Sequence, residues 1–125
     1  MYANKMKIVR KGDGIPVSGM PPVSGHSSGK LLFATKDFSI VMGENEPGTE
    51  FPMHKHGIEE VVIYMPVGKG EQLMEDGTVI PVGPGDIWHE GPGDVHRFKN
   101  TGSEKAVQLQ FFFPPRKQHL DAVGL

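Results

Sequence analysis

Four of the six histidines in this 125-residue chain fall in two short stretches whose spacing suits metal chemistry. The first stretch contains His54, His56 and Glu60, whose even separations would place three side chains on one face of a strand. The second contains His96, which follows a Gly91-Pro92-Gly93 turn and could supply a fourth ligand from a neighbouring strand. The chain has no cysteine, so thiolate sites and disulfides are excluded. Any metal must therefore bind to histidine and carboxylate.

Short strands punctuated by Gly and Pro must position these residues. The chain has 17 Gly and 11 Pro, which separate β-prone segments without a fixed period. The expected strands are Met6 to Arg10, Lys30 to Thr35, Phe38 to Met42, Glu59 to Met65, Gln72 to Glu75, Thr78 to Pro81, Asp86 to Glu90, Val95 to Asn100 and Lys105 to Phe113. The fold class is therefore all-β, with one domain at this length.

Three segments are expected along the chain. Residues 1–29 are expected to form an N-terminal strand and a Gly/Ser/Pro-rich loop, and residues 114–125 a tail. Residues 30–113 are expected to form a small β-barrel, for which the predicted strands suffice. Within the barrel, Asp76-Gly77 predicts a type I′ hairpin turn. In the tail, residues 116–123 could form a short helix after Pro114-Pro115.

The histidine stretches resemble the two motifs of the cupin family. The first motif is a Gly, five residues, His-x-His, three or four residues, Glu, six residues and Gly. Gly48, His54, His56 and Glu60 fit it as written, and Gly68 falls one residue late.

The second motif is a Gly, five residues, Pro-x-Gly, two residues, His, three residues and Asn. Gly85, Gly93, His96 and Asn100 fall in place, whereas Gly91 stands where the family has Pro. The resemblance covers about residues 30 to 113.

The resemblance implies a cupin jelly-roll β-barrel, also called a double-stranded β-helix, with one divalent ion bound by His54, His56, Glu60 and His96. The ion could be Fe, Mn, Ni, Cu, Co or Zn, and about two coordination positions would stay open for an anionic, oxygen-chelating substrate. Dioxygenase chemistry is the first expectation. A lyase, an isomerase and a non-catalytic ligand-binding protein are the alternatives, since fold and ligands do not decide the reaction.

Glu60 has two possible roles, as the fourth ligand or as a general base beside the metal, and the shared parity favours the ligand. Glu59 has the opposite parity and is expected to be solvated or to lie between subunits. The parity of His89 is ambiguous, so a pocket role stays open. His26 and His119 are expected to be exposed.

Further residues have weaker signals. Tyr64, Trp88 and Phe98 could line a ligand cavity, although aromatic residues on strands more often belong to the core. Gln108 and Gln110 share a face; one of them could contact a substrate, but a solvent-facing pair is the simpler interpretation.

Composition limits the partners. The formal charge is −2 and the basic residues are scattered, which argues against nucleic acid. The chain has no apolar run of about 18 residues that could cross a membrane and no signal-like segment, so a cytoplasmic protein with a small-molecule ligand is expected. Apolar edge surface at 6–10 and 111–113 predicts a homodimer.

Overall fold

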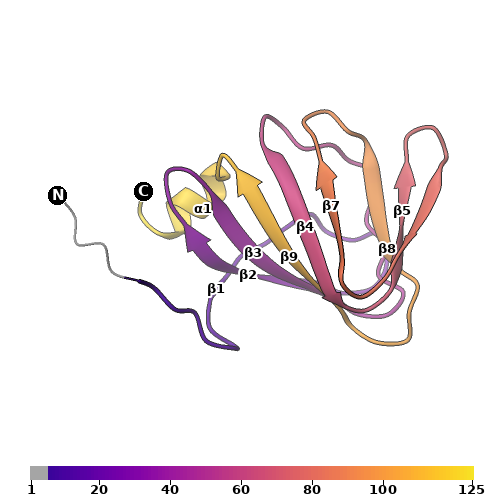
Figure 1. Ribbon diagram of the computed structural model, residues 1–125, viewed down its shortest axis with the longest axis horizontal. Helices are drawn as coiled ribbons and strands as arrows, with labels where there is room; N and C mark the ends of the chain where they lie inside the picture. The colour runs from indigo at the N-terminus through magenta and orange to yellow at the C-terminus, as the bar shows by residue number, and fades with distance from the viewer. Residues whose placement is uncertain (1–5) are drawn as a thin grey trace.

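Two antiparallel β-sheets form the body of the protein in the computed structural model, which describes residues 6–125 (Figure 1). The six-stranded sheet has the order β1-β2-β3-β9-β4-β7 and the three-stranded sheet the order β6-β5-β8. The strands are β1 (Ile15–Pro16), β2 (Ser27–Ala34), β3 (Ser39–Asn45), β4 (Glu60–Val67), β5 (Gly70–Met74), β6 (Val79–Val82), β7 (Asp86–Glu90), β8 (His96–Asn100) and β9 (Ala106–Phe113). The expected all-β, double-sheet fold is confirmed.

Alternation along the strands separates an inner from an outer face. In β3 every second residue is buried, and in β4 the buried residues are Val61, Ile63 and Met65. One cluster of the core joins Val61 and Ile63 to Leu31, Val41 and Phe112. A second cluster contains Met65, Phe98 and Ala106.

The hairpin between β5 and β6 forms at the expected place with a different turn. The amide of Gly77 donates to the carbonyl of Met74 (3.0 Å), and Gly77 has a φ of 89°. Asp76 does not share this positive φ, because among residues 6–125 only glycines adopt it. The loop therefore resembles a type I turn followed by a left-handed Gly, in which Asp avoids the strained conformation that type I′ requires.

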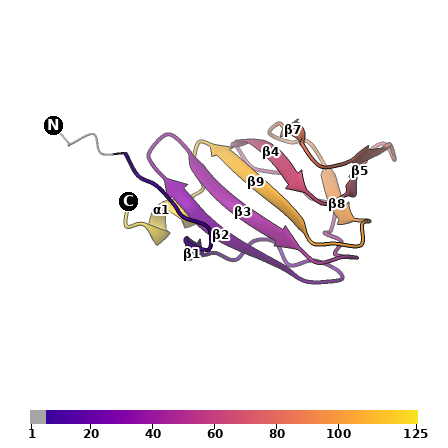
Figure 2. The ribbon, with the colours of Figure 1, turned by 60° about the horizontal axis from the view of Figure 1, so that its bottom comes forward.

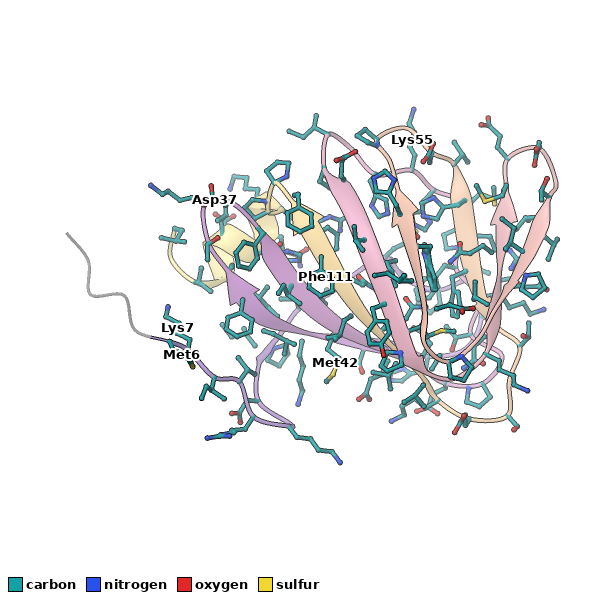
Figure 3. The ribbon with its side chains drawn as sticks, in the orientation of Figure 1. Met6, Lys7, Asp37, Met42, Lys55 and Phe111 are labelled. Carbon is teal, nitrogen blue, oxygen red and sulfur yellow. The ribbon has the colours of Figure 1, made fainter. Side chains whose placement is uncertain are left out.

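The N-terminal expectation needs correction. Residues 6–10 form no strand, and Figure 3 shows Met6 and Lys7 on a segment that extends away from the sheets. The expected loop contains a short strand, β1, which pairs with β2 through Ile15 and Leu31. Residues 1–5 of the expected N-terminal segment lie outside the described residues.

The C-terminal tail forms α1 (Lys117–Ala122), which lies beside β2 (Figure 2). His119 is not exposed as expected but buried, with 3% of its surface accessible. Its Nδ1 lies 2.7 Å from Oγ of Ser39, and its ring packs edge-on against Phe112. Among residues 6–125, no helix has the length and hydropathy needed to cross a bilayer.

Candidate metal centre

His54, His56 and His96 converge inside the protein. One nitrogen of each ring lies within 4.8 Å of the others. A pair of backbone hydrogen bonds, each 2.9 Å, joins His54 to His96 and fixes the segment before β4 against the start of β8. Lys55, between the first two histidines, is exposed near this end of the sheets (Figure 3).

Backbone carbonyls orient two of the three rings. Nδ1 of His54 donates to the carbonyl of Pro52, and Nδ1 of His96 donates to the carbonyl of Asp94, both at 2.9 Å. In the neutral ring of His54 the proton therefore sits on Nδ1 and the lone pair on Nε2 is free, which is the arrangement a metal-binding histidine needs. Both ring nitrogens of His96 donate hydrogen bonds, Nδ1 to Asp94 and Nε2 to Glu90, so a metal ion would have to displace the Nε2 proton.

Glu90, at the end of β7, is the carboxylate that contacts this cluster. Its Oε1 accepts hydrogen bonds from Nε2 of His56 (2.7 Å) and Nε2 of His96 (3.1 Å), and its Oε2 accepts one from Nε1 of Trp88 (2.9 Å). Burial alone would raise the pKa of Glu90, but these hydrogen bonds and the charge of His96 outweigh it and lower the pKa to about 2. Glu90 is thus an anion at neutral pH.

The pKa values of two histidines in the cluster shift in opposite directions. Burial lowers the pKa of His54, and the other two histidines add to this effect. Burial also acts to lower the pKa of His96, but the hydrogen bond and charge of Glu90 outweigh it and raise the pKa.

Glu60, the expected fourth ligand, lies elsewhere. It is the first residue of β4 and points outward, where its Oε1 lies 3.2 Å from Nε2 of His89. The parity argument fails because residues 55–59 do not form a strand, so even spacing from His56 does not carry over to β4. His89, whose orientation the sequence left open, belongs to this exposed outer pair.

Arg116, which precedes α1, reaches the cluster from the C-terminal tail. Its Nε donates to Oε1 of Glu59 (3.1 Å), its Nη2 donates to Nδ1 of His56 (3.3 Å), and the guanidinium lies 5.0 Å from the centre of the Phe112 ring. Glu59 is therefore ion-paired rather than freely solvated. Burial acts to raise the pKa of Glu59, but its own backbone amide and Arg116 outweigh it and lower the pKa.

A cavity of about 580 Å³ opens beside the histidines. Its wall combines apolar side chains from both sheets with polar ones, and Gln108 and Gln110 face into it. The expectation of a solvent-facing glutamine pair is therefore wrong. Phe98 lines the cavity, whereas Tyr64 points outward, and His26 is exposed as expected.

The comparisons with known proteins agree with this geometry. The family model described as Cupin domain matches residues 41–113, which is more than half of the chain. The chain belongs to the cupin family.

Relatives of this cupin include two named binding proteins. Auxin-binding protein 1 from Arabidopsis thaliana is 30% identical over 123 residues, covering 90% of this chain and 62% of the relative. The chain thus spans less than two thirds of that relative's length. The oxalate-binding protein from Thermotoga maritima is 32% identical over 57 residues, 46% of each chain.

A solved structure shows the same fold. It is the crystal structure of a predicted oxalate decarboxylase from Thermotoga maritima, which superposes with a TM-score of 0.73 at 22% identity. The match covers 86% of this cupin and 99% of the other chain.

The family motif explains why sequence reasoning missed Glu90. With four residues after His56, the acidic position of the motif is 61, and Gly68 then follows after the required six residues. This cupin has Val61 there, buried and directly paired across the strands with Glu90. The position of Gly68 thus indicated that the acidic position of the motif is 61 and not 60. It did not indicate that Glu90 would lie against the histidines.

Proposed function

We propose that this cupin binds one divalent transition-metal ion through His54, His56, His96 and Glu90. The observation that carries the proposal is the convergence of three imidazole nitrogens with a buried, ionised carboxylate. This donor set suits Fe, Mn, Ni, Cu, Co or Zn. A bound ion would serve as a Lewis acid for ligand oxygens.

The protein residues around this site have separable roles. Pro52 and Asp94 each accept a hydrogen bond from Nδ1 of one imidazole, which leaves Nε2 as the nitrogen that would face the ion, and the Glu90 carboxylate would offset part of the ion's positive charge. Arg116, in the cavity wall, adds a positive charge to that of the proposed ion. Together these charges favour a small anionic ligand with oxygen donors.

We propose further that the cupin is an enzyme acting on such a ligand, with dioxygenase chemistry as the expected reaction and lyase or isomerase chemistry as the alternative. Metal analysis of untagged protein comes first, followed by oxygen-electrode assays with catechols, hydroxyacids and diketones. Consumption of O₂ supports a dioxygenase, and turnover without it supports a lyase or isomerase. Less than one divalent ion per chain after reconstitution at neutral pH would contradict the metal proposal.

A non-catalytic ligand-binding role is the second candidate, because two relatives are named for the auxin and oxalate they bind. Saturable binding of a carboxylate to the metal-loaded protein, with no turnover in any assay above, would favour it.

We also propose a homodimer, formed through the outer face of the six-stranded sheet. The expected edge surface at 6–10 and 111–113 does not exist, because residues 6–10 form no strand and β9 lies inside the sheet. One row across this face joins Met42, Leu109, Tyr64 and Ile87, and strand pairing places them side by side. Tyr64 is 37% and Ile87 65% exposed. Phe111, labelled with Met42 in Figure 3, lies in the next row of the same face.

Such an apolar face is typical of a subunit interface. Light scattering should give twice the 13.7 kDa chain mass at micromolar concentration. The Ile87→Lys variant should shift the protein toward the monomer, whereas Lys69→Glu, at an exposed position after β4, should not. A wild-type mass of one chain would contradict the proposal.

A further inference from the structure

Three glutamine amides line the cavity on its inner side. Gln72 lies on β5 of the three-stranded sheet, and Gln108 and Gln110 lie on β9 of the six-stranded sheet. Gln72 is 6% and Gln108 4% exposed, so both amides are withdrawn from bulk water. Both sheets thus present amide groups to one internal space.

The hydrogen-bond donors of these amides are under-used. Among residues 6–125, Nε2 of Gln72 is buried without a partner. Nε2 of Gln108 reaches the sulfur of Met65 at 4.0 Å, and Nε2 of Gln110 reaches Oε1 of Gln108 at 3.5 Å, the outer limit of a hydrogen bond. An unpaired buried donor is destabilising, and a leucine of similar size would avoid that cost.

Strand register places the amides close to the metal centre. Gln72 pairs with Phe98 on β8, two residues beyond the Met74–His96 pair. On β9, Gln110 lies two residues from Phe112, whose partner on β4 is Val61 in the layer of Glu90. Two residues of strand correspond to about 7 Å, so Gln72 and Gln110 lie about 7 Å along the strands from the layer of the histidines.

The charge around the amides restricts what they can bind. Arg116 contacts His56, at the histidine end of the cavity, and among residues 6–125 the lining contains no lysine and no second arginine. A carboxylate buried beside the glutamines would lack a cationic partner, whereas an uncharged carbonyl oxygen would satisfy the free N–H groups.

We propose that Gln72, with Gln108 and Gln110, forms a second ligand subsite that accepts an uncharged carbonyl oxygen. This inference rests on the proposed function, because the other end of the ligand is the carboxylate held at the histidine centre. The ligand class is then a carboxylate whose chain carries a carbonyl about four to six carbons away, the length that spans about 7 Å. Oxalate, with its two carboxylates adjacent, is too short to reach both subsites.

The test compares two ligands of equal length on the Zn²⁺-loaded protein. In calorimetric titrations, 5-oxohexanoate should bind about 5- to 10-fold more tightly than hexanoate, the gain expected from one hydrogen bond. The Gln72→Leu variant should abolish this preference, measured as the ratio of the two affinities, and should bind hexanoate no more weakly than the wild type does. The matched control is Gln118→Leu, because Gln118 also lies at the cavity but donates its amide to the carbonyl of Ser18 (2.8 Å); this variant should keep the preference.

Equal binding of the two acids to the wild type, or equal weakening of both in Gln72→Leu, would overturn the subsite. A second measurement needs no metal. If the amide donor is reserved for a ligand, Gln72→Leu should raise the melting temperature of the metal-free protein. A lower melting temperature would show that the glutamine serves the fold and would overturn the inference, whereas failure to bind Zn²⁺ would count against the proposed function alone.

Discussion

Two glutamate–histidine pairs lie on opposite faces of the strand pair formed by β4 and β7, and their surroundings differ sharply. On the inner face, Glu90 contacts His56, and each side chain is 8% exposed. On the outer face, Glu60 contacts His89, and these side chains are 57% and 55% exposed. His89 and Glu90 are consecutive, so the strand pleat alone sends one to solvent and the other to the interior.

The comparison shows that residue type is a weaker guide to chemistry than the face on which a residue lies. An exposed ion pair contributes about 0 to 1 kcal/mol, because water solvates both partners. A buried carboxylate without such solvation depends on its hydrogen bonds, and Glu90 has three of them. We therefore expect the inner pair to belong to the proposed metal site, and we expect loss of the outer pair to leave that site unaffected.

The largest expected difference concerns the histidines of the two faces. His96→Ala removes a proposed nitrogen ligand on the inner face, so the affinity for Zn²⁺ should fall by at least about 100-fold. Loss of a residue that only supports a ligand costs up to about 100-fold, and loss of the ligand itself should cost no less. His89→Ala removes the histidine of the outer pair and should leave Zn²⁺ affinity unchanged. Competition titration with a chromophoric chelator measures both, and equal loss in the two variants would contradict the inner-face assignment.

The two glutamates give a smaller and more decisive contrast. Glu90→Gln keeps the shape of the side chain but removes its negative charge, so Zn²⁺ affinity should fall about 10- to 100-fold. Glu60→Gln should change it less than about 2-fold, because this carboxylate lies in solvent. If Glu60→Gln lost the metal and Glu90→Gln kept it, Glu60 would be the ligand that its sequence spacing suggested.

Much of the fold could be predicted because its signals are local. Gly and Pro mark the strand ends, and the expected Asp86 to Glu90 strand agrees with β7 to the residue. The clustering of His54, His56 and His96 was also predicted from their spacing. A strand beginning at Met6 was not confirmed, since apolar residues alone do not supply a neighbouring strand with which to pair.

The remaining features depend on contacts between distant segments. Glu90 reaches the histidines because β7 pairs with β4, and no motif near Glu90 in the sequence predicts that pairing. Arg116 and His119 reach the interior because the tail folds back beside β2. The inward direction of Gln108 and Gln110 is a matter of register, which a polar pair flanked by apolar residues leaves ambiguous.

Moving the carboxylate from β7 to its partner position on β4 tests whether its place on the inner face is what matters for metal binding. Val61 and Glu90 are direct partners on β4 and β7, and such partners have Cβ atoms about 5 Å apart. Glu90→Val alone should weaken Zn²⁺ binding. Adding Val61→Glu should raise the affinity again by about 10-fold, because a carboxylate on β4 would then face the histidines in place of the one removed from β7. The control pair, Glu90→Val with Val62→Glu, places the carboxylate on the outer face and should recover nothing. Recovery in both double variants would mean that net charge matters rather than position.

The smallest expected effect concerns His119, an inner-face histidine that is not part of the metal centre. Burial lowers its pKa below 6.5, and the charge of Arg116 lowers it further. Below pH 6.5 the unfolded chain therefore binds a proton that the folded chain does not, so the free energy of unfolding should fall as the pH decreases. One pH unit below that value, the loss is at most about 1.4 kcal/mol.

Urea unfolding of metal-free protein at pH 7.5 and 5.5 measures this loss of stability, with His119→Gln as the variant that cannot titrate at this position. The wild type should lose more stability between these pH values than the variant. An identical pH dependence in wild type and His119→Gln would show that His119 titrates in the fold as it does in water, and the contrast between buried and exposed histidines would not extend beyond the metal centre.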